Sequence, residues 1–292
     1  MSAALVTLNY KDEAGCTEVC RRAKECKCID WIIIVDNNSG DGSYEALKKF
    51  EDDKIKVVQT GKNGGYSFGY NYGFTLAKKL GADKAILCNS DVLFDEEMIS
   101  ACIKCLEENP TIGAVSTRQK NIDQVEVTSA WTYPQYWNEI KFCFYFFRKF
   151  ILSKQNEDVY PVKDKMQEVD VLAGCFSVYS MEALEKCGMY DENVFLYNEE
   201  NIISKRLHKT GYTLCRLNDY FYVHAHSRKP GRISTDFKKL LQTAMCSYYF
   251  QVTYQNISVI KKLLFKLCIY CGTFEKWCLN NLHVMFDKIR EK

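Results

Sequence analysis

Asp91 is a lone acidic residue at the end of an apolar run, in the stretch CNSDVLF that begins at Cys88. A carboxylate at the end of a buried strand is costly unless a cation, hydrogen bonds or water receive it. Mg²⁺ and Mn²⁺ draw on few protein ligands and complete their coordination with phosphate and water. The position therefore predicts a divalent cation at Asp91, provided that the ligand brings a diphosphate.

Two further acids, Glu199 and Glu200, begin a helix-like run that stops at Gly211. Acidic residues in the first turn of a helix are often only partners of the helix dipole, and this structural interpretation stays open. Carboxylates in a first turn are also well placed to face a cleft. One of the two could then remove a proton from a hydroxyl group.

The stretch YVHAH places His224 and His226 on the same side of a short strand, because alternate residues of a strand project together. A histidine after a strand often has a structural role. Beside a bound metal, either His224 or His226 could complete the coordination.

Asp36 ends a second apolar run, IIIVDNNSGDGS, and is followed by Asn38, Ser39 and Ser43. An acid at such a strand end can accept hydrogen bonds from a nucleobase or a ribose, while serine and glycine permit a tight turn into the next helix. The alternative is that Asp36 only satisfies the turn.

The stretch GKNGGYSFGYNYGF fits neither the dinucleotide-binding glycine pattern nor the phosphate-loop pattern. The interpretations of the chain as a nicotinamide-dependent protein or as a phosphate-loop protein therefore lose their main support. The glycines instead suggest a helix start packed against a nucleotide, with Asn63 and Asn71 as polar anchors.

The first half of the chain alternates β-rich runs with helix-like runs. Such an order predicts an α/β fold with a mostly parallel sheet covered by helices on both faces. Ligands of such sheets bind beyond the carboxyl ends of the strands, where the polar residues above are found. The four runs expected to be strands are nearly continuous apolar segments: Ala4–Tyr10, Trp31–Asp36, Ile55–Thr60 and Ala85–Asn89.

The remainder divides into an irregular segment, a further α/β part and a helical tail. We expect a catalytic domain over residues 1–231 with an aromatic-rich insertion at about 118–168. Residues 232–292 read as helices that interleave aromatic and aliphatic residues with lysines. Such helices could contact the acceptor or a membrane surface, or join two subunits.

The composition is that of an ordinary folded protein. The 292 residues are 47% hydrophobic and 26% charged, with a formal charge of +2, so nothing attracts nucleic acid. The start lacks a basic leader and no run suits a membrane-spanning helix, which predicts a cytoplasmic protein. The fifteen cysteines should then be reduced and mostly buried, and a zinc site from the pairs Cys102/Cys105 and Cys268/Cys271 is disfavoured.

Taken in order, these motifs resemble glycosyltransferase family 2, and within it the rhamnosyltransferase-like branch. The resemblance spans roughly residues 3–228. It is carried by the stretches VTLNY, IIIVDNNSGDGS, NGGYSFGYNYG, LCNSDVLF, VLAGCFSVYS, FLYNEENIISKRLHKTGY and VHAHS.

This resemblance implies a GT-A fold, a nucleotide-sugar donor, Mg²⁺ or Mn²⁺, and inversion at the anomeric carbon. Asp91 falls on the metal-binding acid of the family's DxD motif, and Gly174 falls on the loop that lies against the donor sugar on the acceptor side. The residues expected around the nucleotide and its sugar are Thr7, Asn9, Asp36, Asn38, Asn63, Asn71 and Asn89.

The family's Glu-Asp base motif corresponds to Glu199-Glu200. We expect Glu200 to be the base, with Glu199 as the alternative, and His224 to join Asp91 at the metal. The family usually has Asp-Leu shortly after this pair, whereas the present chain has Ile202-Ile203. That departure puts the polar contacts of the helix in doubt more than the base.

The implied reaction transfers a sugar from dTDP-rhamnose or a UDP-sugar to a glycan or lipid-linked glycan in cell-surface polysaccharide synthesis. Expected partners are the donor, the acceptor, a second copy of the chain, and the inner face of the cytoplasmic membrane as a peripheral contact. Two alternatives stay open, namely an inactive relative that acts as a binding or assembly subunit, and a sugar nucleotidyltransferase. The nucleotidyltransferase should carry a glycine-rich basic loop after the first strand, and NYKDEAGC lacks one.

Overall fold

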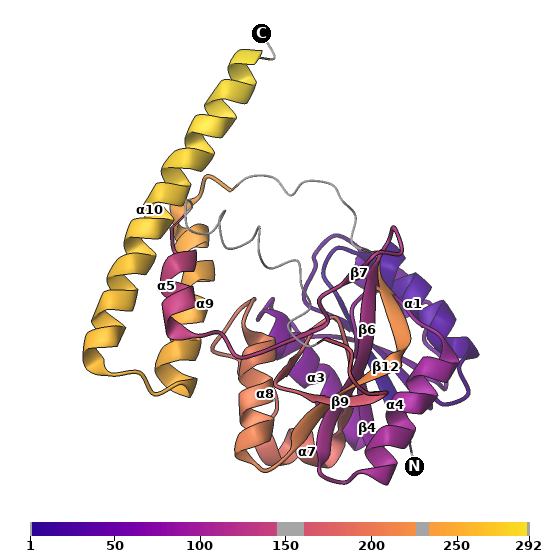
Figure 1. Ribbon diagram of the computed structural model, residues 1–292. Coiled ribbons are helices and arrows are strands. Elements are labelled where there is room, and N and C mark those ends of the chain that lie inside the picture. The colour runs from indigo at the N-terminus through magenta and orange to yellow at the C-terminus, as the bar shows by residue number, and fades with distance from the viewer. Residues whose placement is uncertain (1, 145–160, 226–233, 291–292) are drawn as a thin grey trace. The chain divides into compact units, whose positions relative to one another are not determined.

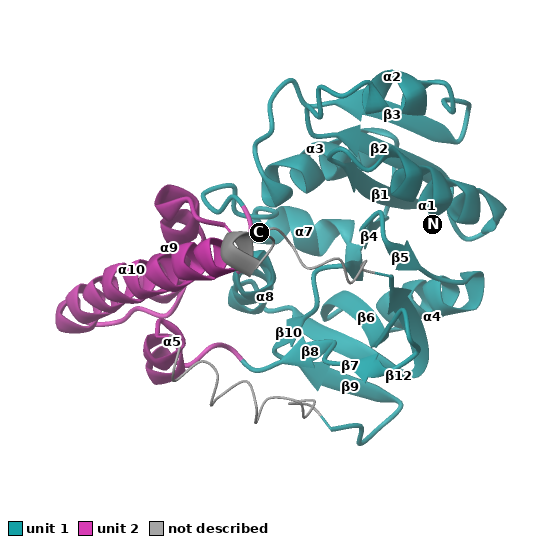
Figure 2. Cartoon of the chain, turned by 90° about the horizontal axis from the view of Figure 1, so that it is seen from above, with its two compact units in different colours: residues 1–132, 158–195, 199–226 teal, residues 133–157, 196–198, 227–292 magenta. Residues whose placement is uncertain are grey.

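The computed structural model describes residues 2–144, 161–225 and 234–290 (Figure 1). The chain forms two compact units (Figure 2). Unit 1 comprises residues 1–132, 158–195 and 199–226, and unit 2 comprises residues 133–157, 196–198 and 227–292. The expected boundary near Gly231 and the candidate ligand His226 lie outside the described residues, so the division at residue 231 stays a prediction.

Unit 1 begins with four parallel strands in the order β3-β2-β1-β4. Their bounds are Ala3–Asn9 (β1), Trp31–Asp36 (β2), Ile55–Gln59 (β3) and Lys84–Cys88 (β4). The connecting helices are α1 (Glu13–Glu25), α2 (Ser43–Lys48) and α3 (Tyr66–Lys79). Because β1 pairs with β2 in a register that sets Asn9 opposite Asp36, the two predicted polar strand ends meet.

The sheet continues beyond β4 with a reversal of direction. Strand β11 (Phe176–Ser180) runs antiparallel to β4 and to β6 (Ile112–Asn121), and β12 (Thr213–His224) runs parallel to β6. Strand β12 is long and has an irregular register after Leu217. The short strands are β5 (Val92–Leu93), β7 (Glu126–Val127), β8 (Ala130–Trp131), β9 (Met166–Val169) and β10 (Val171–Leu172).

Helices cover both faces of this sheet, which confirms the predicted α/β class. Helices α1, α2 and α4 (Glu96–Glu108) share one apolar core with the sheet. Helices α3, α7 (Met181–Cys187) and α8 (Glu199–Lys209) share the core of the other face. Helix α7 starts at Met181, where the Ser180 side chain accepts a hydrogen bond from the backbone of Ala183.

Unit 2 is helical, as expected for the tail. It contains α5 (Tyr136–Phe142), α9 (Phe237–Tyr254) and α10 (Val259–Arg290). The side chains of Tyr136, Phe265 and Ile269 form its small apolar core. Within the described residues, neither α9, α10 nor any other helix combines the length and apolarity that crossing a bilayer requires.

Candidate active site

The first part of the site lies where β1 and β2 end. Asp36 is fully buried, and its carboxylate accepts hydrogen bonds from Asn9 Nδ2 (2.7 Å), Ser39 Oγ (2.6 Å) and Gln59 Nε2 (2.9 Å). Both oxygens of Asp36 are therefore engaged by the protein. Asn9 and Thr7 are equally buried, so their roles toward a nucleoside, like that of Asp36, stay predictions.

Residues after β2 and before α3 form a second polar group. Asn37 Nδ2 donates to Asn63 Oδ1 (3.1 Å) and to the Gly65 carbonyl (3.0 Å), which ties the two loops together. Asn38 is exposed and has a left-handed backbone with φ of 57°. A conformation of this kind is tolerated well by asparagine. Asn38 and Asn63 thus belong to the loops that border the strand ends.

Asn71 occupies a different place. Its Nδ2 donates to the Tyr190 carbonyl (2.9 Å) and to Glu192 Oε1 (2.8 Å), and its Oδ1 accepts from the Tyr190 backbone (3.0 Å). The amide therefore fastens α3 to the segment that follows α7. Its expected contact with the donor stays a prediction.

Tyr66 links the end of β4 to the start of β11. Its hydroxyl lies 3.1 Å from Asn89 Oδ1 and also contacts the Gly174 carbonyl. Tyr70 donates to the same Asn89 oxygen at 3.0 Å. Burial raises the pKa of Tyr66 well above its ordinary value, so the phenol stays protonated and keeps its hydrogen for bonding.

Gly174 packs directly against Glu200. A Cβ atom at position 174 would lie 2.8 Å from both Cγ and Oε1 of Glu200, so only glycine permits this approach. Burial raises the pKa of the Glu200 carboxyl, and hydrogen bonds from its own backbone and from that of Gly174 oppose the rise. Glu199, by comparison, is almost completely buried, with 5% of its surface exposed.

Asp91 and His224 form a pair at the end of β12. Asp91 Oδ1 lies 3.1 Å from His224 Nε2, and about a quarter of each side chain is exposed, at 25% and 22%. Burial by itself would lower the pKa of His224. The hydrogen bond to Asp91 and the neighbouring Cys175 prevail and raise it from 6.5 to about 10.

A buried network of hydrogen bonds contacts the His224 side of the Asp91–His224 pair. His224 Nδ1 lies 3.3 Å from Gln119 Nε2, and Gln119 Oε1 accepts a hydrogen bond from the Tyr222 hydroxyl at 2.9 Å. Cys175 Sγ in turn lies 3.2 Å from that hydroxyl. Neither Gln119, Tyr222 nor Cys175 was predicted, because nothing in the sequence signals contacts between β6, β11 and β12.

The dipeptide Gly174-Cys175 therefore joins the two halves of the site. Gly174 contacts the predicted base Glu200, and Cys175 contacts the network behind the predicted metal ligands Asp91 and His224. The backbone of Asn89, two residues before Asp91, also donates to the Cys175 carbonyl at 2.9 Å. The carboxylate expected to act as a base and the pair expected to hold a cation thus belong to one continuous set of contacts.

The donor chemistry of Asp91 and His224 suits Mg²⁺ or Mn²⁺, which take carboxylate oxygen and, for Mn²⁺, imidazole nitrogen. Among residues 2–144, 161–225 and 234–290 there is no group of three or more His, Cys, Asp or Glu side chains that could hold a metal. A two-residue site of this kind fits a cation that takes its remaining ligands from a diphosphate and water.

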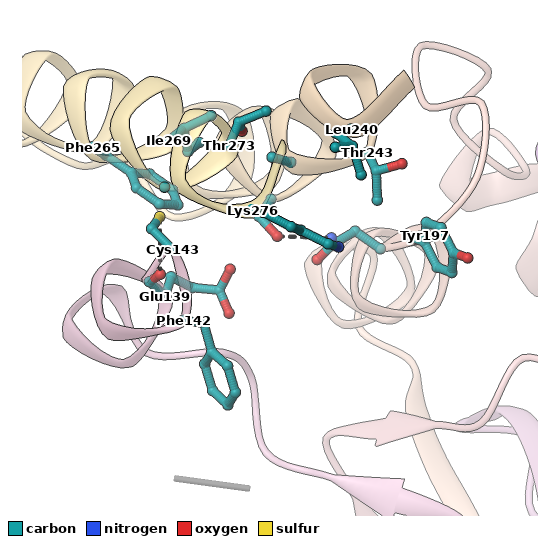
Figure 3. Close-up of a pocket in the computed structure, with 14 residues that line it drawn as sticks. Glu139, Phe142, Cys143, Tyr197, Leu240, Thr243, Phe265, Ile269, Thr273 and Lys276 are labelled. Carbon is teal, nitrogen blue, oxygen red and sulfur yellow. Dashed lines mark hydrogen bonds between the residues drawn. The ribbon is translucent and has the colours of Figure 1, made fainter. Parts of the chain in front are cut away.

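A separate pocket of about 360 Å³ lies within unit 2 (Figure 3). Helices α5, α9 and α10 contribute apolar walls, which include Leu240, Phe265 and Ile269. Polar groups accompany them, since Asn198 Nδ2 donates to Ser247 Oγ at 3.2 Å. Burial raises the pKa of the Glu139 carboxyl in the same pocket. No motif of the chain predicted this pocket.

Comparison with known proteins identifies the family of the chain. No curated protein sequence matches the chain. Among solved structures, mannosyltransferase PcManGT from Pyrobaculum calidifontis, in complex with GDP-Man and Mn²⁺, has a TM-score of 0.58 at 12% identity. The match covers 94% of this chain and 73% of that one. TarS 1-349 of S. aureus in complex with UDP has a TM-score of 0.55 at 14% identity, with 92% and 70% of the two chains covered.

A third similar structure is GalNAc-T7 with UDP, GalNAc and Mn²⁺, with a TM-score of 0.61 at 12% identity, where 96% of this chain and 57% of that one are covered. At such identities the likeness demonstrates the GT-A fold alone. The sequence model of Glycosyl transferase family 2, however, matches residues 16–188, more than half of the chain. The chain therefore belongs to glycosyl transferase family 2 and is a glycosyltransferase.

Proposed function

We propose that this glycosyltransferase moves a sugar from a nucleoside diphosphate donor to an acceptor hydroxyl with inversion at the anomeric carbon. The observation that carries the proposal is the Gly174-Cys175 connection between Glu200 and the Asp91–His224 pair. A base on one side of a donor sugar and a cation at its diphosphate on the other are the two groups that a single displacement needs.

In this mechanism Asp91 would hold Mg²⁺ or Mn²⁺, and His224 would join it as a neutral imidazole, giving up the proton that its pairing with Asp91 favours. When bound, the cation supplies positive charge that offsets the charge of the departing diphosphate. Gln119 would orient the His224 ring, since its Nε2 lies 3.3 Å from His224 Nδ1. Asp91 Oδ1 lies 3.1 Å from His224 Nε2, so the two side chains would share the cation.

Glu200 accepts the proton of the acceptor hydroxyl, which attacks the anomeric carbon from the face opposite the departing group. The Gly174 backbone fixes the carboxylate for this role, and its lack of a side chain leaves room beside it. A raised pKa makes Glu200 a better proton acceptor than an ordinary glutamate. Glu199 is the alternative base, although its nearly complete burial argues against direct contact with an acceptor.

For the donor, the motif resemblance to the rhamnosyltransferase-like branch supports dTDP-rhamnose first and a UDP-sugar second. The similar structures contain GDP-Man or UDP, which supports a nucleoside diphosphate donor without selecting the base. We place the reaction in the synthesis of a cell-surface polysaccharide, in the cytoplasm.

A thermal-shift panel tests the donor. The full-length protein is heated with dTDP-rhamnose, UDP-glucose, UDP-GlcNAc or GDP-mannose, each with and without Mn²⁺. A ligand that binds only the native state raises the melting temperature, and at 100 times its Kd it stabilises the protein by about 2.7 kcal/mol. We expect one donor to raise the melting temperature, and more so with Mn²⁺. If no nucleotide sugar changes it under either condition, the proposed function is wrong.

The unit 2 pocket supports an acceptor with both apolar and hydroxylated parts, such as a lipid-linked glycan. Its apolar walls and its polar group of Glu139, Asn198 and Ser247 would suit the two parts. Thr243→Phe, at an exposed position of the pocket lining, should raise the acceptor KM by about tenfold or more, a loss of about 1.4 kcal/mol. Hydrolysis of the donor should not change.

The control is Thr253→Phe, another exposed threonine of helix α9, which does not line the pocket. Steady-state transfer to a glycan that supports the reaction gives both KM values. An acceptor KM that stays at the wild-type value in Thr243→Phe contradicts the role of the pocket.

A further inference from the structure

Helix α10 has apolar side chains on two opposite faces. One face carries Phe265 and Ile269, which are 1% and 2% exposed and pack in the core of unit 2. The other face carries six large apolar residues, here called the α10 stripe, that are between 39% and 79% exposed. They are Ile260, Leu263, Leu264, Leu267, Tyr270 and Phe274.

The spacing of the α10 stripe makes it continuous. At 3.6 residues per turn the six side chains fall within an arc of about 120°, which is the width of a face that an amphipathic helix normally buries. Here that face is open in the described structure. Contiguous exposed apolar surface of this kind marks an interaction site more often than chance.

The charges beside the α10 stripe identify the partner. Between residues 259 and 274 the helix carries Lys261, Lys262 and Lys266 and no acidic residue. By helical geometry Lys261 borders one edge of the stripe and Lys266 the other. Lys261, which also lies over the Tyr136 ring at 5.1 Å, and Lys266 are both exposed. A second copy of this stripe would bring the same three lysines against one nearby acid, Glu275, which follows Phe274 directly.

We infer that the α10 stripe lies in the interface of a bilayer that contains anionic lipid. The apolar side chains would enter the boundary between headgroups and acyl chains, and the flanking lysines would meet the negative headgroups. The helix would lie on the membrane, since no described helix is suited to span it. This inference goes beyond sugar transfer and does not depend on it.

Vesicle flotation tests the inference with the full-length protein. The vesicles contain phosphatidylcholine alone or with 30% phosphatidylglycerol. We expect the protein to float with the anionic vesicles and far less with the neutral ones. Leu263→Ser/Leu267→Ser should abolish flotation. Lys261→Gln/Lys266→Gln, which removes the lysine at each edge of the stripe, should weaken binding to anionic vesicles by about 25-fold, since each lysine contributes about fivefold.

The matched control is Ile122→Ser/Val125→Ser, which removes two comparably exposed apolar side chains, at 52% and 57%, from unit 1. It should float like the wild type. Flotation that is absent in the wild type, or unchanged in Leu263→Ser/Leu267→Ser, overturns the inference. So does a wild-type dimer by light scattering that becomes monomeric in this variant without any vesicle binding. Donor-induced thermal shifts on the same preparations report separately on the proposed function.

Discussion

Asp91→Asn should lower sugar transfer by on the order of 100- to 1,000-fold, the loss typical of removing one charge-stabilising group from an active site. Asparagine keeps the shape of the side chain but removes the negative charge that would hold a divalent cation. His224 also loses the carboxylate that raises its pKa to about 10. The affinity for Mn²⁺, measured by electron paramagnetic resonance of the free ion in the presence of the donor, should fall with the activity.

The control for this variant is Asp53→Asn, because Asp53 is an exposed acid in the loop between α2 and β3. It should keep both wild-type activity and wild-type Mn²⁺ affinity. Because Asp91 helps to raise the pKa of His224 in the folded protein, Asp91→Asn should also lower the melting temperature without ligands at neutral pH, and transfer is therefore compared well below that temperature. Wild-type transfer rates in Asp91→Asn would rule out the proposed cation site.

Glu200→Gln should lower transfer by about 100- to 10,000-fold, the range that general base catalysis contributes. The amide cannot accept the proton of the acceptor hydroxyl, but it fills the same space beside Gly174. Binding of the donor, followed by its thermal shift, should therefore persist. The loss should appear in kcat for transfer to the acceptor.

The pH dependence of transfer by the wild type is a second test of Glu200 as the base. A base must be deprotonated to act, so transfer should fall as the pH drops through the pKa of Glu200. Burial raises that pKa, and the acidic limb of the profile should lie above the ordinary range of a glutamate. This limb should be missing from the residual activity of Glu200→Gln.

Glu199→Gln distinguishes the two candidate bases, because it changes the neighbouring carboxyl in the same conservative way. If Glu200 is the base, Glu199→Gln should keep the acidic limb of the pH profile even where burial makes the variant less stable. A larger loss of kcat in Glu199→Gln than in Glu200→Gln, with the limb gone, would transfer the role to Glu199.

The parallel half of the sheet could be predicted from the sequence because its strands are buried on both faces and read as continuous apolar runs. The ends of such strands meet at one edge, and Asn9 and Asp36 do lie together, with 2.7 Å between Nδ2 and Oδ1. The rest of the sheet could not be predicted in this way. The antiparallel position of β11 between β4 and β6 depends on pairing between segments far apart in the chain.

The same limit applies to the site. Position at the end of a recognisable element singled out Asp91 and the Glu199-Glu200 pair, and the family resemblance favoured Glu200 over Glu199. Gln119 lies within β6 and Cys175 directly before β11, and only the assembled sheet brings them next to Tyr222 of β12. Asn71 illustrates the converse, since its place in a glycine-rich motif did not reveal its hydrogen bonds to Tyr190 and Glu192.

Unit 2 is discontinuous along the chain, and this has a practical consequence. Helix α5 is encoded more than ninety positions ahead of α9, yet its Tyr136 ring packs on Phe265 of α10 at 5.8 Å and its hydroxyl donates to the Lys261 carbonyl. A truncated protein that stops before α9 would retain α5 with its apolar side exposed to solvent. Deleting α9 and α10 would thus expose a new apolar surface on α5 as well as removing the exposed apolar residues of α10. Aggregation of such a fragment would therefore carry no information about what α10 contacts in the cell.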